Sequence, residues 1–122
     1  MAVVVDASAI GAIMFDEPDA AMLSAHLEGQ TLLAPALIDF ELSNLALKKS
    51  RKRPDQLPQI FSSLQAALAL PISRIAVPGA EAFALAAETG LTAYDASYLW
   101  LARSRDAELV TLDSELARFA PR

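Results

Sequence analysis

Short apolar runs alternate along the chain with longer segments in which apolar residues recur every three or four positions. This spacing places side chains on one face of a helix, so the longer segments predict helices. Alternating strands and helices are typical of a parallel sheet covered by helices. We therefore expect an α/β fold, with a central parallel sheet of four to five strands and helices on both faces. The expected strands are Ala2–Val5, Thr31–Ala34, Ile72–Val77 and Glu108–Leu112.

Proline and glycine residues mark where the expected helices begin and end. A helix is expected to follow Pro35, with a broad apolar stripe made of Leu37, Phe40, Leu45 and Leu47. The segment Gln56–Leu70 is amphipathic, with apolar side chains at Leu57, Ile60, Phe61, Leu64 and Leu68. Further helices are expected over Ala80–Thr89, ended by Gly90, over Ala93–Arg105, and after Asp113.

Length and composition limit the class of protein. With 122 residues, 54% of them hydrophobic, the chain predicts a single domain over residues 1–122 that can build a core without disulfides. The lack of cysteine excludes thiolate metal sites, and His26 as the only histidine excludes a His-rich zinc site. A net charge of −5 argues against a protein that coats nucleic acid by bulk charge, although a local basic patch stays open.

Neither apolar stretch that could contact a membrane has the features of a membrane segment. The N-terminal MAVVVD lacks a basic region and reads as a first strand, not a signal peptide. The uncharged stretch Gln56–Ser73 contains two prolines and several polar residues, so it is a poor membrane span. We expect a soluble, cytoplasmic protein with no membrane partner.

Carboxylates follow two of the expected strands. Asp6 follows VVV and Asp113 follows LVTL, and the carboxyl ends of parallel strands lie at one edge of a sheet, so the two acids should approach each other. Glu41 and Asp95 lie near the starts of helices that can reach the same edge. Four carboxylates at one edge would repel, and oxygen ligands suit a hard cation such as Mg²⁺ or Mn²⁺.

Helix capping is the alternative role for these acids. Asp6 and Asp113 could each cap the helix that follows, and Thr92 with Asp95 has the spacing of a capping box. Glu41 is expected to lie too far into its helix to cap, beside apolar neighbours where an unpaired carboxylate is costly. Glu41 therefore favours a functional role for the set.

Four short segments follow one another along nearly the whole chain: VVVDASAI, PALIDFELSNLALK, LTAYDASYLWLA and ELVTLDSELARF. In this order they resemble the PIN-domain nucleases and, within them, the VapC-type toxins of bacterial toxin–antitoxin pairs. The resemblance implies a PIN-like three-layer fold and cleavage of RNA that depends on Mg²⁺ or Mn²⁺. It also implies a cognate antitoxin as partner and a homodimer.

Carried over residue by residue, the resemblance assigns a catalytic and metal-binding tetrad and three polar residues that support it. The tetrad is Asp6, Glu41, Asp95 and Asp113, and the supporting residues are Ser8, Asn44 and Thr111. A housekeeping PIN nuclease of RNA processing is the alternative to a toxin.

A basic run and three aromatic residues complete the candidate features. Half of the chain's ten Lys and Arg residues lie at Lys48, Lys49, Arg51, Lys52 and Arg53, where they could contact RNA phosphates or a partner. Alternatively, they complement the dipole at a helix C-terminus. Tyr94, Tyr98 and Trp100 share one expected helix, where packing in the core or a dimer is favoured over stacking on bases.

Other classes of protein fit the acids less well. A signalling receiver needs an acidic pair after its first strand and a lysine after its last, and this chain has one acid there and no lysine after Thr111. A phosphatase with an aspartyl nucleophile needs D-x-D where this chain has D-A-S. The hypothesis of an inactive binding module requires that the four acids serve only as helix caps.

Overall fold

The four apolar runs form one parallel sheet in the computed structural model, which describes residues 1–121. Within these residues the strands are β1 (Ala2–Val5), β2 (Thr31–Pro35), β3 (Ile72–Ile75) and β4 (Glu108–Val110), in the order β3-β2-β1-β4. Val4 of β1 lies opposite Leu33 of β2 and Leu109 of β4. The expected α/β architecture is confirmed, with four strands in the described part of the chain.

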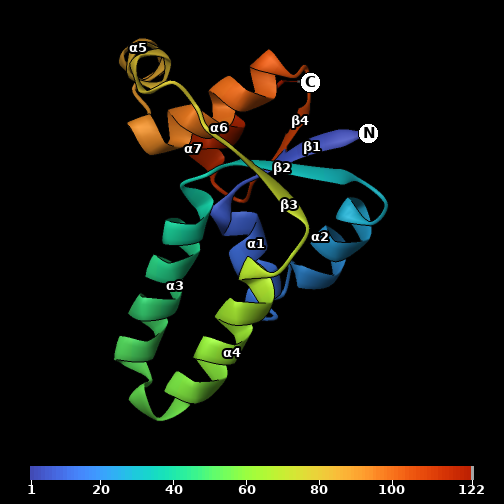
Figure 1. The fold of residues 1–122 in the computed structure, drawn as a ribbon, viewed down its shortest axis with the longest axis vertical. Helices are drawn as coiled ribbons and strands as arrows, with labels where there is room; N and C mark the ends of the chain where they lie inside the picture. Colours follow the sequence, from blue (N-terminus) through green and yellow to red (C-terminus); the bar gives the residue numbers. More distant parts are fainter. Residues whose placement is uncertain (122) are drawn as a thin grey trace.

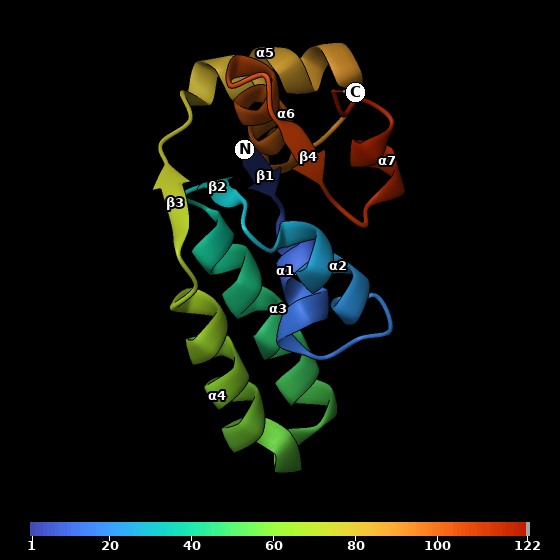
Figure 2. The same cartoon turned by 90° about the vertical axis from the view of Figure 1, so that its right-hand side faces the viewer.

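Helices cover both faces of the sheet (Figure 1). One face carries α1 (Ala7–Met14), α2 (Ala20–Leu27), α3 (Ile38–Lys52) and α4 (Leu57–Leu68). The other carries α6 (Ala93–Ser104) against the strands, with α5 (Gly79–Thr89) and α7 (Ser114–Ala117) packed beside it. A 3₁₀ turn at Pro54–Gln56 joins α3 to α4, and this two-helix hairpin projects away from the sheet (Figure 2).

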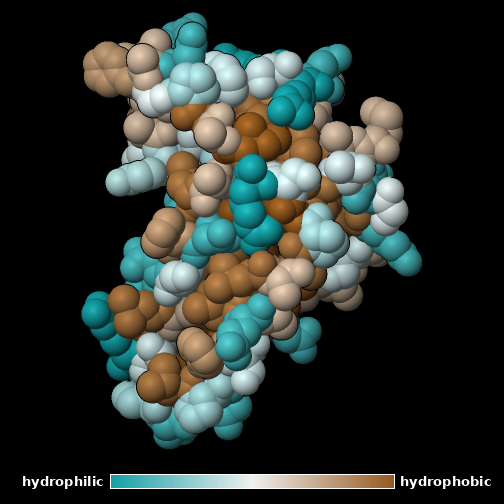
Figure 3. Space-filling model, viewed as in Figure 1, coloured by the Kyte–Doolittle hydropathy of each residue, from teal (hydrophilic) through white to brown (hydrophobic). Residues whose placement is uncertain are grey.

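The core lies on both sides of the central strand β1. Val3, Val4 and Val5 are almost fully buried because helices cover both faces, which explains why this strand is continuously apolar. Apolar side chains also gather along the α3–α4 hairpin (Figure 3). No helix within residues 1–121 combines the length and the apolar character needed to cross a membrane.

The expected apolar stripe of α3 is confirmed for Leu37 and Leu45, which pack against the core, and is wrong for Phe40 and Leu47, which are exposed. Ile38, Leu42 and Ala46 form the buried face instead. Apolar residues surround most of the first half of this helix, so periodicity alone did not select the packed face. In α4, similarly, Ile60 is buried but Leu57 and Phe61 are exposed.

The start of α3 also differs from the expectation. Pro35 ends β2, where it lies opposite Ile75 of β3, and α3 begins only at Ile38. Glu41 therefore lies in the first turn of α3, closer to the sheet edge than expected.

The connection into β4 creates the crevice that holds the candidate site. The chain adds β2 and β3 on one side of β1 and then crosses to place β4 on the other side. Ligands of open α/β sheets bind at such a reversal of strand order, outside the carboxyl ends of the strands. Helix α1 leaves this crevice close to α3. The absence of a side chain at Gly11 allows this approach, since a Cβ there would lie 2.8 Å from Cδ1 of Leu45.

Candidate active site

Asp6 lies at the end of β1 and is held by donors on both carboxylate oxygens. Its Oδ1 accepts from the Ser8 hydroxyl at 2.7 Å and from the Ala9 N–H at 3.0 Å, and Oδ2 accepts from the Thr111 hydroxyl. The bond from Ala9 makes Asp6 the N-cap of α1. Only 5% of Asp6 is exposed to solvent. The capping role is therefore real, but it does not account for the two hydroxyl donors.

Ser8 and Thr111 also connect Asp6 to the loop after β4. The Ser8 hydroxyl accepts from the Leu112 N–H at 2.9 Å, and the Thr111 hydroxyl accepts from the Asp113 N–H at 3.0 Å. Both hydroxyls thus donate to a carboxylate and accept from the backbone, which sets the direction of their protons. The carboxylate after β1 and the loop after β4 form one hydrogen-bonded unit.

Glu41 is held by a residue that sequence reasoning assigned to packing. The Tyr98 hydroxyl donates a 2.6 Å hydrogen bond to Oε1 of Glu41 and joins α6 to α3. Tyr98 is almost fully buried. It lies three residues after Asp95, on the same face of α6. That spacing is the signal that could have identified it in the sequence.

Asp95 and Asp113 lie at the starts of two further helices. Thr92 caps α6 by accepting from the Asp95 N–H at 3.1 Å, so one half of the expected capping box is present. Asp113 caps α7 by accepting from the N–H groups of Glu115 and Leu116. As with Asp6, a carboxylate that caps a helix also faces the crevice.

All four acids line one cleft of about 240 Å³. Residues from opposite ends of the chain meet there, because β1 and β4 are neighbours and α3 and α6 lie on opposite faces of the sheet. The polar lining is completed by Ser8, Asn44, Lys48 and Tyr98. The structure therefore brings the expected tetrad together in one place. We refer to this space as the acidic cleft.

Burial and mutual repulsion raise the pKa of three of these acids. Burial is the main cause for Asp6, and the hydrogen bonds from Thr111, Ser8 and Ala9 partly oppose it. Burial also raises the pKa of Glu41, against the hydrogen bond from Tyr98. The pKa of Asp95 is raised by burial and by the charges of Asp113 and Asp6. A cation in the acidic cleft would relieve this repulsion.

The donors suit a small hard cation. The side chains offer carboxylate oxygens, as Mg²⁺ and Mn²⁺ prefer. Within residues 1–121, no three acidic or histidine side chains are already close enough to hold one ion together. Mg²⁺ is nevertheless commonly held by one or two carboxylates while it keeps several water ligands. The donor set therefore fits such an ion, with Asp6 as its most rigidly held ligand.

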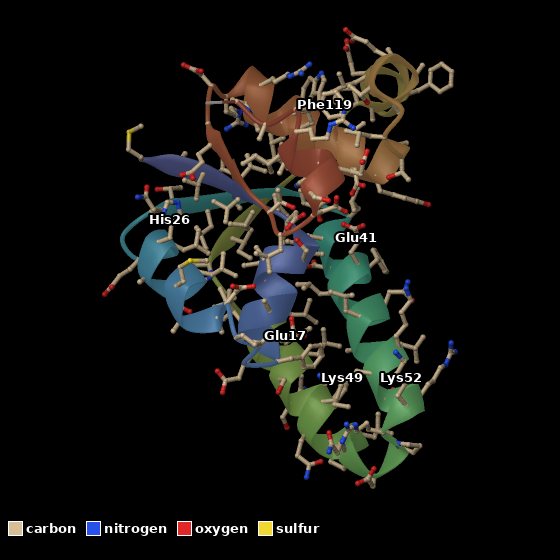
Figure 4. The ribbon with its side chains drawn as sticks, turned by 180° about the vertical axis from the view of Figure 1, so that it is seen from behind. Glu17, His26, Glu41, Lys49, Lys52 and Phe119 are labelled. Atoms are coloured by element: carbon tan, nitrogen blue, oxygen red, sulfur yellow. The ribbon has the colours of Figure 1, made fainter. Side chains whose placement is uncertain are left out.

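The other expected residues divide into those at the acidic cleft and those outside it. Asn44 lines the cleft, but no hydrogen bond to the acids is found for it in the described part of the chain. Lys48 also lines the cleft, and Lys48, Lys49, Lys52 and Arg53 line an adjoining hollow of about 570 Å³. Arg51 lies outside both spaces. Figure 4 shows Lys49 and Lys52 farther along α3 from Glu41.

Several charged residues have structural partners instead. Asp39 accepts from Arg74 at 2.9 Å, and the same Arg74 donates to the carbonyls of Leu68 and Ile72. The ring of His26 lies 2.9 Å from the Glu108 carboxylate, a contact that no sequence pattern indicated. None of these residues lines the acidic cleft.

Comparison with known proteins assigns the chain to a family. The PIN domain model matches residues 3–121. The curated relative ribonuclease VapC3 of Pyrobaculum aerophilum is 35% identical over 126 residues, which cover 99% of this chain and 96% of the relative. The crystal structure of PAE2754 from Pyrobaculum aerophilum matches with a TM-score of 0.77 and 32% identity, covering 98% of this chain and 87% of that one. The chain thus belongs to the PIN-domain family, as a VapC-type member.

Proposed function

We propose that this protein is an endoribonuclease that depends on Mg²⁺ or Mn²⁺ and hydrolyses phosphodiester bonds in the acidic cleft. The observation that supports it most directly is the convergence of Asp6, Glu41, Asp95 and Asp113 on one cleft at the reversal of strand order. The similarity of the chain to a ribonuclease over nearly its whole length supports RNA as the substrate.

The chain's own residues would prepare this cleft for a cation and a phosphate. Asp6 would be a metal ligand held in one orientation, because Ser8, Ala9 and Thr111 donate hydrogen bonds to its carboxylate. Tyr98 orients Glu41 across the cleft, and Asp95 and Asp113 complete the set from their helix starts. When bound, the metal ion supplies a water activated at neutral pH and relief of charge on the phosphate oxygens.

We also propose that the protein is a toxin held inactive by a cognate antitoxin in the cytoplasm. The acidic cleft would attract an Arg or Lys side chain of that partner. An apolar hollow of about 210 Å³ between α1 and α4, lined by Ile10, Met14 and Leu70, could bind an apolar anchor. Buried apolar anchors carry most interface energy, so their loss should weaken inhibition more than loss of the cation. A homodimer stays a prediction.

The substitution Asp6→Asn tests the assignment of the acidic cleft. It removes the ligand charge, but the amide can still cap α1. We expect cleavage of single-stranded RNA in Mn²⁺ to be lost while the circular dichroism spectrum stays unchanged. Mn²⁺ should raise the melting temperature of the wild type but not of Asp6→Asn.

A matched control is Asp55→Asn, because Asp55 is an exposed acid in the 3₁₀ turn and does not line the cleft. It should behave as the wild type in both assays. Unchanged cleavage by Asp6→Asn, with the same metal requirement, would contradict the proposed site. A protein that neither cleaves RNA nor is stabilised by Mn²⁺ would instead be a binding module.

A further inference from the structure

Three spaces adjoin one another along helix α3. The acidic cleft shares Glu41 and Asn44 with a hollow of about 540 Å³ that is also lined by Phe40 and Tyr94. It shares Ser8, Leu45 and Lys48 with the hollow that contains the other lysines. We call these the aromatic hollow and the basic hollow. The acidic cleft therefore lies between an apolar space and a positively charged one.

The aromatic hollow presents flat apolar surfaces to solvent. Phe40 is 79% exposed and Tyr94 is 64% exposed, and Leu37 and Leu47 add aliphatic surface. Phe40 comes from the first turn of α3, and Tyr94 comes from the first turn of α6. Exposed aromatic side chains that line a hollow indicate a binding site more often than isolated ones do. The amide of Asn44, at the edge shared with the acidic cleft, can both donate and accept hydrogen bonds.

The basic hollow has the opposite character. Lys48, Lys49, Lys52 and Arg53 line it, with Glu17 as the acidic residue among its lining side chains. The Lys49 ammonium lies 4.5 Å from the centre of the Phe15 ring, which holds it at the wall of this hollow. Lysine and arginine in a groove bind phosphates without regard to base sequence.

We propose that the aromatic hollow binds an unpaired nucleobase of the RNA whose backbone crosses the acidic cleft and continues over the basic hollow. This inference rests on the proposed ribonuclease function and adds a binding site for one base of the substrate. A single strand offers separate bases to aromatic side chains and phosphates to cations. A duplex keeps its bases stacked inside, so it could use the basic hollow but not the aromatic one.

The position of the aromatic hollow favours RNA over another occupant. Glu41 and Asn44 belong to both the hollow and the acidic cleft, so a group in the hollow lies directly beside the acids. A nucleobase in the hollow would lie at this distance from the acids if its own phosphate were bound in the acidic cleft. A second copy of the chain could also cover Phe40 and Tyr94, and sedimentation of the variants distinguishes this outcome from RNA binding.

The test measures binding of a labelled single-stranded RNA of about 12 nucleotides by fluorescence anisotropy, with Asp6→Asn as the background to prevent cleavage. Adding Tyr94→Ala or Phe40→Ala should weaken binding roughly 5- to 150-fold, the effect of losing one stacked base. Tyr94→Trp should retain the affinity because it keeps an aromatic face. Binding of a matched duplex should change little.

Phe83→Ala is the matched control, because Phe83 is a 72% exposed aromatic residue on α5 that lines neither hollow. It should leave RNA affinity unchanged. Sedimentation of each variant is measured at the same protein concentration. Loss of affinity that follows loss of the ring, with unchanged sedimentation, supports the proposal. Unchanged affinity overturns it, and so does a loss accompanied by a change in oligomeric state.

The two proposals fail in different ways. If the wild type binds single-stranded RNA through Tyr94 but does not cleave it in Mn²⁺, the nuclease function is wrong and the base site stands. If it cleaves RNA but Phe40→Ala and Tyr94→Ala cleave and bind as well as the wild type, the base site is wrong and the nuclease function stands.

Discussion

The hydroxyl of Tyr98 donates a 2.6 Å hydrogen bond to Oε1 of Glu41, so a buried tyrosine of α6 orients an acid of α3 across the acidic cleft. The bond stabilises the ionised form of Glu41, in opposition to burial and the charges of Asp95 and Asp6, which raise the pKa of this acid. Tyr98 is therefore a positioning residue for the proposed site.

Tyr98→Phe should reduce RNA cleavage roughly 10- to 100-fold, the usual effect of removing a partner of a metal ligand. Loss of the hydrogen bond raises the pKa of Glu41 further, so more of the acid is protonated at mildly acidic pH. The deficit should therefore shrink as pH rises. Rates measured across the pH range check this, and a deficit independent of pH would indicate a loss of packing only.

The stability of the metal-free protein should depend on the charge of Asp6. Its folded pKa is raised above the ordinary value of 3.8, so the folded state binds the proton more tightly than the unfolded state. The stabilising effect of this proton is present below 3.8 and is lost as pH rises through the raised folded pKa. In EDTA, the melting temperature of the wild type relative to Asp6→Asn should therefore fall with increasing pH. Parallel curves for the two proteins would contradict this.

Thr111 should matter through its hydroxyl. Thr111→Val removes a donor to Asp6 and an acceptor for the Asp113 N–H with little change in shape. We expect the concentration of Mn²⁺ needed for half-maximal stabilisation to rise roughly 10- to 100-fold. Thr111→Ser keeps the hydroxyl and is the matched control, expected to retain most of the affinity. Equal effects of the two substitutions would assign the role to the methyl group.

Arg74 should contribute to stability and not to catalysis. It joins Asp39 of α3 to the carbonyls of Leu68 and Ile72, at the end of α4 and in β3. Arg74→Met leaves these acceptors without their donor and should lower the free energy of unfolding by about 1–3 kcal/mol. Urea unfolding measures this, with Arg105→Met at an exposed position as control. Cleavage under native conditions should stay close to that of the wild type.

The basic hollow should contribute to the salt dependence of RNA binding. Lys52 lines this hollow, whereas its neighbour Arg51 does not. Lys52→Ala should reduce the slope of log affinity against log salt by about 0.7, the value for one phosphate contact on a single strand. Arg51→Ala removes the same charge from the same helix and should change the slope less. Equal changes of the slope in the two variants would mean that the basic residues attract RNA through their total charge and not through contacts in the basic hollow.

Much of the fold could be predicted because it depends on local patterns. The four strands were located correctly from their apolar runs, although β3 and β4 end two residues earlier than expected. Gly90 ends α5 as expected, with a φ of 79° in the left-handed region that glycine adopts freely. Strand propensity and helix termination depend mainly on neighbouring residues, so the sequence alone contains this information.

By itself, the sequence also determined that Asp6 and Asp113 lie at the carboxyl edge of a parallel sheet, since Asp6 directly follows β1 and Asp113 lies three residues after the end of β4. Only the tertiary structure decided which face of α3 is buried, and therefore that Phe40 lies exposed beside Glu41. It also decided that Tyr98 meets Glu41, 57 positions away in the sequence. Such contacts depend on how α3 and α6 are placed by the sheet between them. No local pattern specifies that placement, because it results from the packing of the whole core.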